Sequence, residues 1–262
     1  MKVKLSRIPI MLVLVSLVMA SQFADLEICL ANDDVNANSN ISKEEITNNN
    51  ALGGCDVFGY TLDDSEPFKR IDVSSGTDTG LTSADHVTEA ISIPFNFSFY
   101  GNIYNKVYIQ SHGCLSFTDT TYTYTWSFDS KIPDPAKPNN VIAPYWGPNF
   151  LSPSGWVRYT SGGNIPNQYF IIEWHDLTFY AGNSFTFQTI LYENGDIVFQ
   201  YGPMLTGGSM VACAMGGIEN ITGKDGLAYL NFCGWPTPYE AVRSLTPDPN
   251  TWNYAFLPPI TE

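Results

Sequence analysis

The chain has 262 residues, of which 44% are hydrophobic and 15% are charged, and its formal net charge is −14. A strongly acidic surface repels phosphate backbones, which excludes nucleic acid as a partner and suits an extracellular or salty medium. The folded part, about 200 residues, is long enough to bury one sizeable core, so we expect a single domain that folds without a partner.

The N-terminus has the pattern of an export signal. Residues 1–20, MKVKLSRIPIMLVLVSLVMA, contain three basic residues, then an apolar run over 8–19, then the small residue Ala20. This pattern predicts a secretory signal peptide over 1–20, because the apolar run is too short to span a bilayer comfortably. A second possible cleavage after Ala31 would also remove Cys29. Cleavage after residue 20 removes three basic and no acidic residues, which lowers the net charge to −17.

Composition divides the rest of the chain. Residues 32–54 are rich in Asn, Ser and charge, which predicts a disordered leader. From Cys55 onward, short runs of aromatic and β-branched residues alternate with turn residues, and we assign 55–243 to the folded domain and 244–262 to a C-terminal tail. No window has helical periodicity with a cap, so we predict an all-β fold, an antiparallel β-sandwich of about ten strands. The candidate strands are 89–101, 106–113, 114–119, 140–146, 155–161, 168–177, 184–193, 196–202, 210–219 and 227–233.

The segment TILYENGDIVFQYG, residues 189–202, carries the strongest hairpin signal. Asn194-Gly195 between two apolar runs predicts a two-residue type I′ turn, since that turn needs positive φ at both central residues. In this register Leu191 faces Val198. One face, which we expect to point into the core, carries Tyr192, Ile190, Ile197, Phe199 and Tyr201.

We find no catalytic motif, and the prediction is that the chain is not an enzyme. The three histidines lie outside any nucleophile or metalloprotease pattern. Glu173 is the one residue that raises the alternative of a secreted hydrolase, because glycosidases pair two carboxylates. Strand alternation places Asp176 on the opposite face from Glu173, so the two do not converge locally.

A cofactor is not expected, although one loop has oxygen ligands. The segment DVSSGTDTG, residues 72–80, offers Asp72, Asp78 and several hydroxyls, which suit Ca²⁺. Its spacing fits no EF-hand, and an ordinary Asx-turn loop is the alternative reading.

An aromatic ribbon gives a second functional alternative. The segment TYTYTWSF, residues 121–128, alternates Tyr122, Tyr124, Trp126 and Phe128 with Thr and Ser. These rings form either an inward core face or an exposed platform on which a glycan stacks. The second interpretation would make the protein a carbohydrate-binding module.

Four cysteines in the predicted domain suggest two disulfides in an exported chain. If 210–219 and 227–233 pair symmetrically about Gly223, Cys213 faces Cys233 and Ile218 faces Ala228, which predicts a Cys213–Cys233 bridge. Two alternatives stay open. A bulge at 216–217 would shift the register by one residue, and Cys114 and Cys213 could instead be buried free thiols.

The second predicted bridge joins the two cysteines that are left, Cys55 and Cys114. It would fasten the start of the domain to a central strand and close a long loop.

Five segments in order resemble the nidogen-like (NIDO) extracellular domain of bacterial and archaeal secreted proteins. They are SIPFNFSFYGNIYNKVYIQSHGCLSF, IPDPAKPNNVIAPYWGPNF, GWVRYTSGGNIPNQYFIIEWHDLTF, TFQTILYENGDIVFQYG and GGIENITGKDGLAYL, within residues 55–235. The resemblance implies a β-rich extracellular domain linked to cell–matrix or cell-surface adhesion, and it supplies no catalytic residues.

Together these observations predict a secreted or cell-surface adhesion domain. We expect it to bind an extracellular protein or a glycan surface, with no nucleic acid and no membrane span. Three N-x-S/T sequons, at Asn40, Asn96 and Asn220, are glycosylation sites only where the host has that machinery.

Overall fold

A computed structural model describes residues 55–63, 69–81, 86–118, 131–147, 150–179, 183–204, 210–237 and 253–259. All of them lie in the unit Asn50–Glu262, one of the two units into which the chain divides. Every strand pairing in this part of the chain is antiparallel, and none of its residues is helical, as the sequence predicts.

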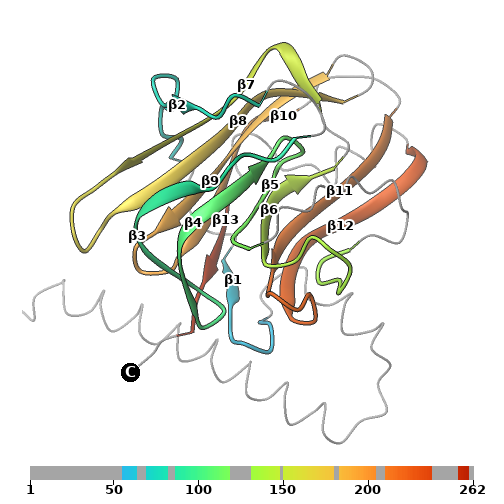
Figure 1. Cartoon of the computed structure of the whole chain (residues 1–262). Coiled ribbons are helices and arrows are strands. Elements are labelled where there is room, and N and C mark those ends of the chain that lie inside the picture. Colours follow the sequence, from blue (N-terminus) through green and yellow to red (C-terminus); the bar gives the residue numbers. More distant parts are fainter. Residues whose placement is uncertain are drawn as a thin grey trace, which may run out of the picture. The chain divides into compact units, whose positions relative to one another are not determined.

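The strands form two sheets (Figure 1). The seven-stranded sheet has the order β1-β13-β10-β9-β8-β7-β2. Its strands are β1 (Thr61–Asp63), β2 (Thr77–Asp78), β7 (Phe150–Gly162), β8 (Tyr169–Phe179), β9 (Asn183–Tyr192), β10 (Ile197–Met204) and β13 (Asn253–Leu257).

The six-stranded sheet has the order β12-β11-β6-β5-β4-β3. Its strands are β3 (Ile91–Phe99), β4 (Asn102–Gln110), β5 (Cys114–Ser116), β6 (Val141–Trp146), β11 (Met210–Glu219) and β12 (Gly226–Thr237). The predicted β-sandwich is therefore confirmed, and the additional strands β1, β2 and β13 are short.

One aromatic-rich core lies between the sheets. Strand alternation sends Phe97 and Phe99 of β3 inward from one sheet and Trp174 of β8 inward from the other, and all three are fully buried. Two inward-pointing polar groups donate hydrogen bonds across the core. The Trp174 indole donates to the carbonyl of Gln110 at 2.9 Å, and the Tyr201 hydroxyl donates to that of Pro144 at 2.6 Å.

The register of the β9–β10 hairpin differs from the prediction by one residue. Leu191 faces Ile197 rather than Val198, and the Tyr192 N–H donates to the carbonyl of Asp196 at 2.9 Å. The loop therefore has three residues, and only Gly195 has positive φ, +98°. The dipeptide Asn-Gly suits both loop types: a three-residue loop, in which a type I turn is followed by a glycine bulge, and a two-residue type I′ turn.

The shift changes which side chains of the hairpin face the core. The prediction that Ile190 and Tyr192 point inward is wrong, because both pack on the outer face of the sheet. Ile197, Phe199 and Tyr201 point inward as predicted.

A type I′ turn does occur at the β3–β4 hairpin. Tyr100 and Gly101 both have positive φ, +47° and +72°, and Phe99 faces Asn102 across the two-residue loop.

The predicted pairing of Cys213 with Cys233 across β11 and β12 is confirmed at the level of the backbone. Near the turn, Ile218 faces Leu227 and not Ala228, because the register shifts by one residue between Gly216 and Gly217. The bulge lies between the turn and the cysteines, so it absorbs the offset and leaves the cysteines opposed.

Strand β13 lies in the segment that the sequence assigns to a C-terminal tail. It pairs with β10 on one side and β1 on the other, and its Phe256 is fully buried against Phe199. The seven-stranded sheet therefore extends beyond residue 243. In the part of the chain that the structure describes, no helix is long and apolar enough to cross a membrane.

Candidate functional site

A row of polar side chains crosses the outer face of the seven-stranded sheet. Glu173 of β8 lies between its cross-strand neighbours Arg158 of β7 and Gln188 of β9. Its neighbours in sequence, Ile172 and Trp174, point into the core, so alternation turns Glu173 outward. The Glu173 side chain is nevertheless fully buried.

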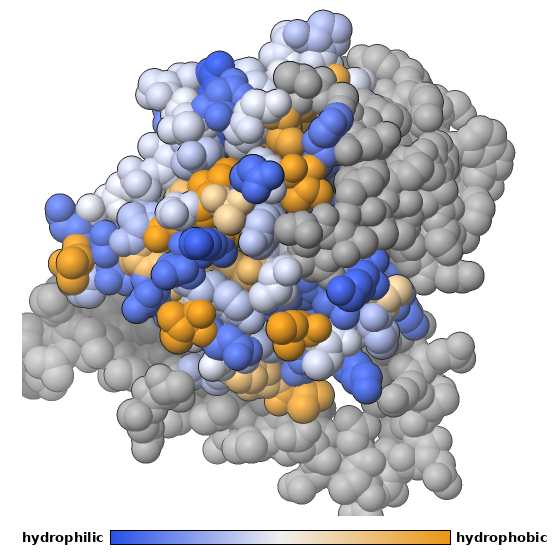
Figure 2. All heavy atoms as spheres, in the orientation of Figure 1, coloured by the Kyte–Doolittle hydropathy of each residue, from blue (hydrophilic) through white to orange (hydrophobic). Residues whose placement is uncertain are grey.

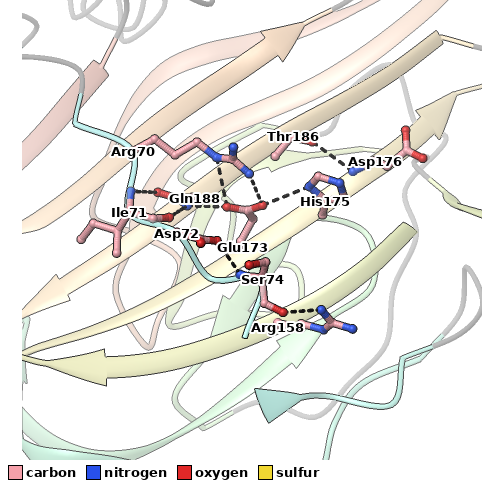
Figure 3. A network of polar contacts seen from close by, with 10 residues as sticks. All are labelled: Arg70, Ile71, Asp72, Ser74, Arg158, Glu173, His175, Asp176, Thr186 and Gln188. Atoms are coloured by element: carbon pink, nitrogen blue, oxygen red, sulfur yellow. Dashed lines mark hydrogen bonds and ion pairs between the residues drawn. The ribbon is translucent and has the colours of Figure 1, made fainter. Parts of the chain in front are cut away.

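Glu173 is buried because residues 69–78, which we call the outer segment, cross this face of the sheet (Figure 3). Arg70 of the outer segment donates to both carboxylate oxygens of Glu173, with N–O distances of 2.6 and 3.3 Å. The His175 Nδ1 lies 3.0 Å from one of these oxygens, and the Gln188 amide donates to the other. Each carboxylate oxygen thus has two partners.

Gln188 also holds the backbone of the outer segment. Its amide nitrogen donates to the carbonyl of Ile71 at 2.6 Å, and its amide oxygen accepts from the N–H of the same residue at 3.3 Å. Two residues further on, Val73 is buried against Ile171 and Ile190 on the outer face. A polar clamp and an apolar contact therefore lie side by side.

Arg158 fixes the other end of the outer segment. It donates to the carbonyl of Ser74 at 2.6 Å and to the carboxylate of Asp78 at 3.2 Å. Its guanidinium lies 4.6 Å from the centre of the Trp156 ring, which also stacks on His175 at 4.4 Å. The Trp156 ring therefore contacts the side chains of Arg158 and His175.

This geometry bears on the hydrolase alternative. A glycosidase acid needs an oxygen that reaches the substrate and a second carboxylate across the cleavage site. Arg70, His175 and Gln188 already engage both oxygens of Glu173, and Figure 3 shows the carboxylate of Asp176 pointing elsewhere. The arrangement gives Glu173 the role of an anchor for the outer segment.

A second buried carboxyl group lies where three turns meet at one end of the sandwich. Asp56 accepts from the N–H groups of Gly59 and Tyr60, both at 2.8 Å, and from the Tyr100 hydroxyl at 2.6 Å. Burial raises the pKa of Asp56 to about 6, although these hydrogen bonds oppose the shift. Asp225 of the β11–β12 turn accepts from the N–H of Val57 at 3.0 Å.

A third buried carboxyl group, Glu219, lies on the six-stranded sheet. Burial raises its pKa to about 8, and it accepts from the N–H of Asp134 at 2.9 Å. Burial of the Cys114 thiol raises its pKa, and the nearby charge of Glu219 adds to the shift. Cys114 is a free, buried cysteine, so the predicted Cys55–Cys114 bridge is wrong.

Two of the features predicted from the sequence are not described by the structure. The ribbon of Tyr122, Tyr124, Trp126 and Phe128 lies outside the described residues, as do the side chains of Cys213 and Cys233, so the ribbon and their bridge stay predictions.

Asp72 and Asp78 each accept from the N–H two residues further on, at 2.9 Å, as in Asx turns. Hydrogen bonds from Ser74 lower the pKa of Asp72. No group of three or more His, Cys, Asp or Glu side chains is placed to hold a metal ion among the residues with described positions.

Sequence reasoning missed the surface formed by the three turns. Val57 and Phe58 lie in DVFG, Ile103 follows Tyr-Gly-Asn, and Ile221 lies in NITG. An apolar residue surrounded by turn residues is a signal for an exposed apolar side chain, and all four are exposed.

The fold and these sites define an all-β domain of two antiparallel sheets, with anchoring carboxylates buried beneath its surface segments. A family model described as NIDO related matches residues 59–246, which is more than half of the chain. The chain belongs to the NIDO-related family, as its resemblance to the nidogen-like domain indicates. No curated protein and no solved structure matches it significantly.

Proposed function

We propose that this protein is a non-catalytic interaction domain that acts at the cell surface or in the extracellular medium. The observation that carries the proposal is the NIDO-related match over residues 59–246, because this family suggests an extracellular interaction domain. The export signal predicted over residues 1–20 and the net charge of −14 agree with this location.

The contacts of Glu173 also support a non-catalytic role. A buried carboxylate that is bonded to Arg70, His175 and Gln188 stabilises the surface segment above it. We therefore expect binding to survive Glu173→Gln in any variant that stays folded.

A direct binding measurement tests the proposal. The exported form of the chain is immobilised, and its binding to cell-envelope fragments and to purified matrix proteins is followed as a function of concentration, with heat-unfolded protein as the control. Saturable binding that requires the folded chain is expected. Binding to none of these surfaces, or turnover of a polysaccharide or peptide, would overturn it.

A glycan array separates the carbohydrate-binding alternative from adhesion to proteins. Binding to defined glycans that is lost on Trp126→Ala would favour the aromatic ribbon as the ligand site.

A further inference from the structure

Four exposed apolar side chains gather where the three turns meet. We call them the end patch: Val57, Phe58, Ile103 and Ile221, which are 88%, 38%, 62% and 50% exposed. They come from the turn at 56–60, the start of β4 and the β11–β12 turn. Figure 2 shows apolar residues, in orange, along the lower edge of the described part, where Figure 1 places these turns.

Contacts between the turns hold the end patch together. The N–H of Val57 donates to Asp225 in the β11–β12 turn at 3.0 Å. The rings of Phe58 and Tyr100 are 5.3 Å apart, and Tyr100 is three residues from Ile103. The patch is thus built on a fixed base, although its residues are far apart in the sequence.

Several backbone N–H groups in these turns have partners within the chain. Asp56 accepts from Gly59 and Tyr60, and Asp225 accepts from Val57. In the β11–β12 turn, Asn220 accepts from the N–H groups of Thr222 and Gly223, at 2.9 and 3.0 Å. Each internal partner lowers the free-energy cost of moving a turn into an apolar medium, where water is not available to bond its N–H groups.

The composition of the patch distinguishes between possible occupants. Protein interfaces are centred on Trp, Tyr and Arg, whereas the end patch has three aliphatic side chains and one Phe, on separate turn tips. A lipid bilayer is fluid, so it can accommodate projecting apolar side chains without having a complementary shape. The net charge of −14 opposes binding to an anionic surface, which leaves a zwitterionic one.

We infer that the end patch inserts its four apolar side chains into the interfacial region of a zwitterionic lipid bilayer. The domain then lies on the membrane without spanning it, and buried apolar area rather than charge provides the attraction. This inference goes beyond the proposed function, since an interaction domain can act without touching lipid.

The test uses the exported form of the full chain and phosphatidylcholine vesicles, and sedimentation measures the partition coefficient. We expect saturable binding that salt does not weaken, and weaker binding at low salt to vesicles that contain phosphatidylglycerol. Each of Ile103→Asp and Ile221→Asp should lower the partition coefficient by about tenfold or more, as loss of one buried Ile side chain implies.

Ile165→Asp is the matched control. Ile165 is 79% exposed, but it belongs to the β7–β8 connection rather than to the three turns. Its replacement should leave vesicle binding unchanged. Equal losses in all three variants, or no binding to phosphatidylcholine by the original chain, would overturn the inference.

A reporter variant tests insertion directly. In Phe58→Trp, the added indole should shift its emission to shorter wavelength on vesicles and be quenched by brominated phosphatidylcholine, and no quenching contradicts insertion. If the patch variants instead lose binding to lipid-free envelope protein, the end patch is a protein interface. In that case the lipid inference fails while the proposed function stands.

Discussion

Glu173 shows how one residue determines the position of a surface segment. Its carboxylate has no solvent contact, so the free energy of keeping it buried depends on the groups that bond to it. Among the described residues, Arg70 is the one side chain that donates to both of its oxygens, and the Arg70 side chain is 40% exposed.

We expect Arg70→Ala to lower the free energy of unfolding by about 2 kcal/mol, since it leaves a buried carboxylate without its cation and part of the pair is exposed to solvent. Urea denaturation measures the change. In Arg70→Ala/Glu173→Gln the uncompensated charge is absent, so the double variant should lose less stability than Arg70→Ala alone. A double variant with a lower free energy of unfolding than Arg70→Ala would contradict this role of Arg70.

Asp56 makes stability depend on pH. Its pKa is raised from 3.8 to about 6 in the folded state, so the folded chain binds the proton more tightly than the unfolded chain. The stabilising contribution is fully present below pH 3.8 and is lost as the pH rises through 6. Between these values the free energy of unfolding should fall by about 3 kcal/mol relative to Asp56→Asn, which cannot ionise.

Glu219 supplies an internal control for this experiment. Its pKa is raised from 4.5 to about 8, so the comparison with Glu219→Gln should show a loss of stability that continues to about pH 8. Identical pH windows for the two variants would mean that the dependence does not come from these two groups.

At the scale of elements, the strands follow from the sequence more closely than the connections do. Runs of alternating apolar residues mark the long strands, but the Asn194-Gly195 signal is compatible with loops of two or three residues, and only the folded hairpin distinguishes them. Tertiary contacts decide the choice, since Ile190 packs beneath Val73 of the outer segment. Residues 69–78 contain no long apolar run that would predict this position.

Replacement of Gly195 tests the observed hairpin. Gly195→Ala places a side chain at φ +98° and 3.1 Å from Pro258, and it should cost about 1–2 kcal/mol of unfolding free energy. Asn194 has a negative φ, so Asn194→Ala should cost less, namely its two exposed hydrogen bonds to the N–H and the carboxylate of Asp196. Equal costs at both positions would favour the type I′ turn.

The opposed positions of Cys213 and Cys233 give a chemical prediction. Directly facing residues of an antiparallel pair have Cα atoms about 4.5–5.5 Å apart, within the range of a disulfide. Peptide mapping of the non-reduced protein should therefore recover a Cys213–Cys233 linked fragment. Cys114 should react with iodoacetamide only after unfolding, and a linked peptide that contains Cys114 would contradict the structure.

At the scale of the whole molecule, the fold class and the family follow from strand spacing and from the order of five segments. The end patch does not, because contacts between distant parts of the chain bring its turns together, as between Val57 and Asp225 and between Phe58 and Tyr100. The extent of the domain is also missed. NYAFL is a short strand between segments rich in proline, and its role depends on two neighbours that lie elsewhere in the sequence.

Truncation tests how much of the chain the domain needs. A chain that ends at residue 246, where the family match ends, lacks β13, which leaves β1 without its described strand neighbour and β10 paired with β9 alone. We expect it to lose cooperative unfolding in circular dichroism. Phe256→Ala in the full chain, a milder change, should cost about 3–5 kcal/mol. A truncated chain with unchanged stability would mean that β13 does not contribute to the stability of the domain.

The pairing of β1 with β13 also sets an order of events during synthesis. Thr61 faces Leu257, so β1 gains its only neighbour among the described strands only when β13, far along the sequence, has been synthesised. A ribosome releases the chain from its N-terminus, and contacts of such large sequence separation form slowly. The larger sheet is therefore completed only once residues 253–257 have left the ribosome, however early its other strands pair.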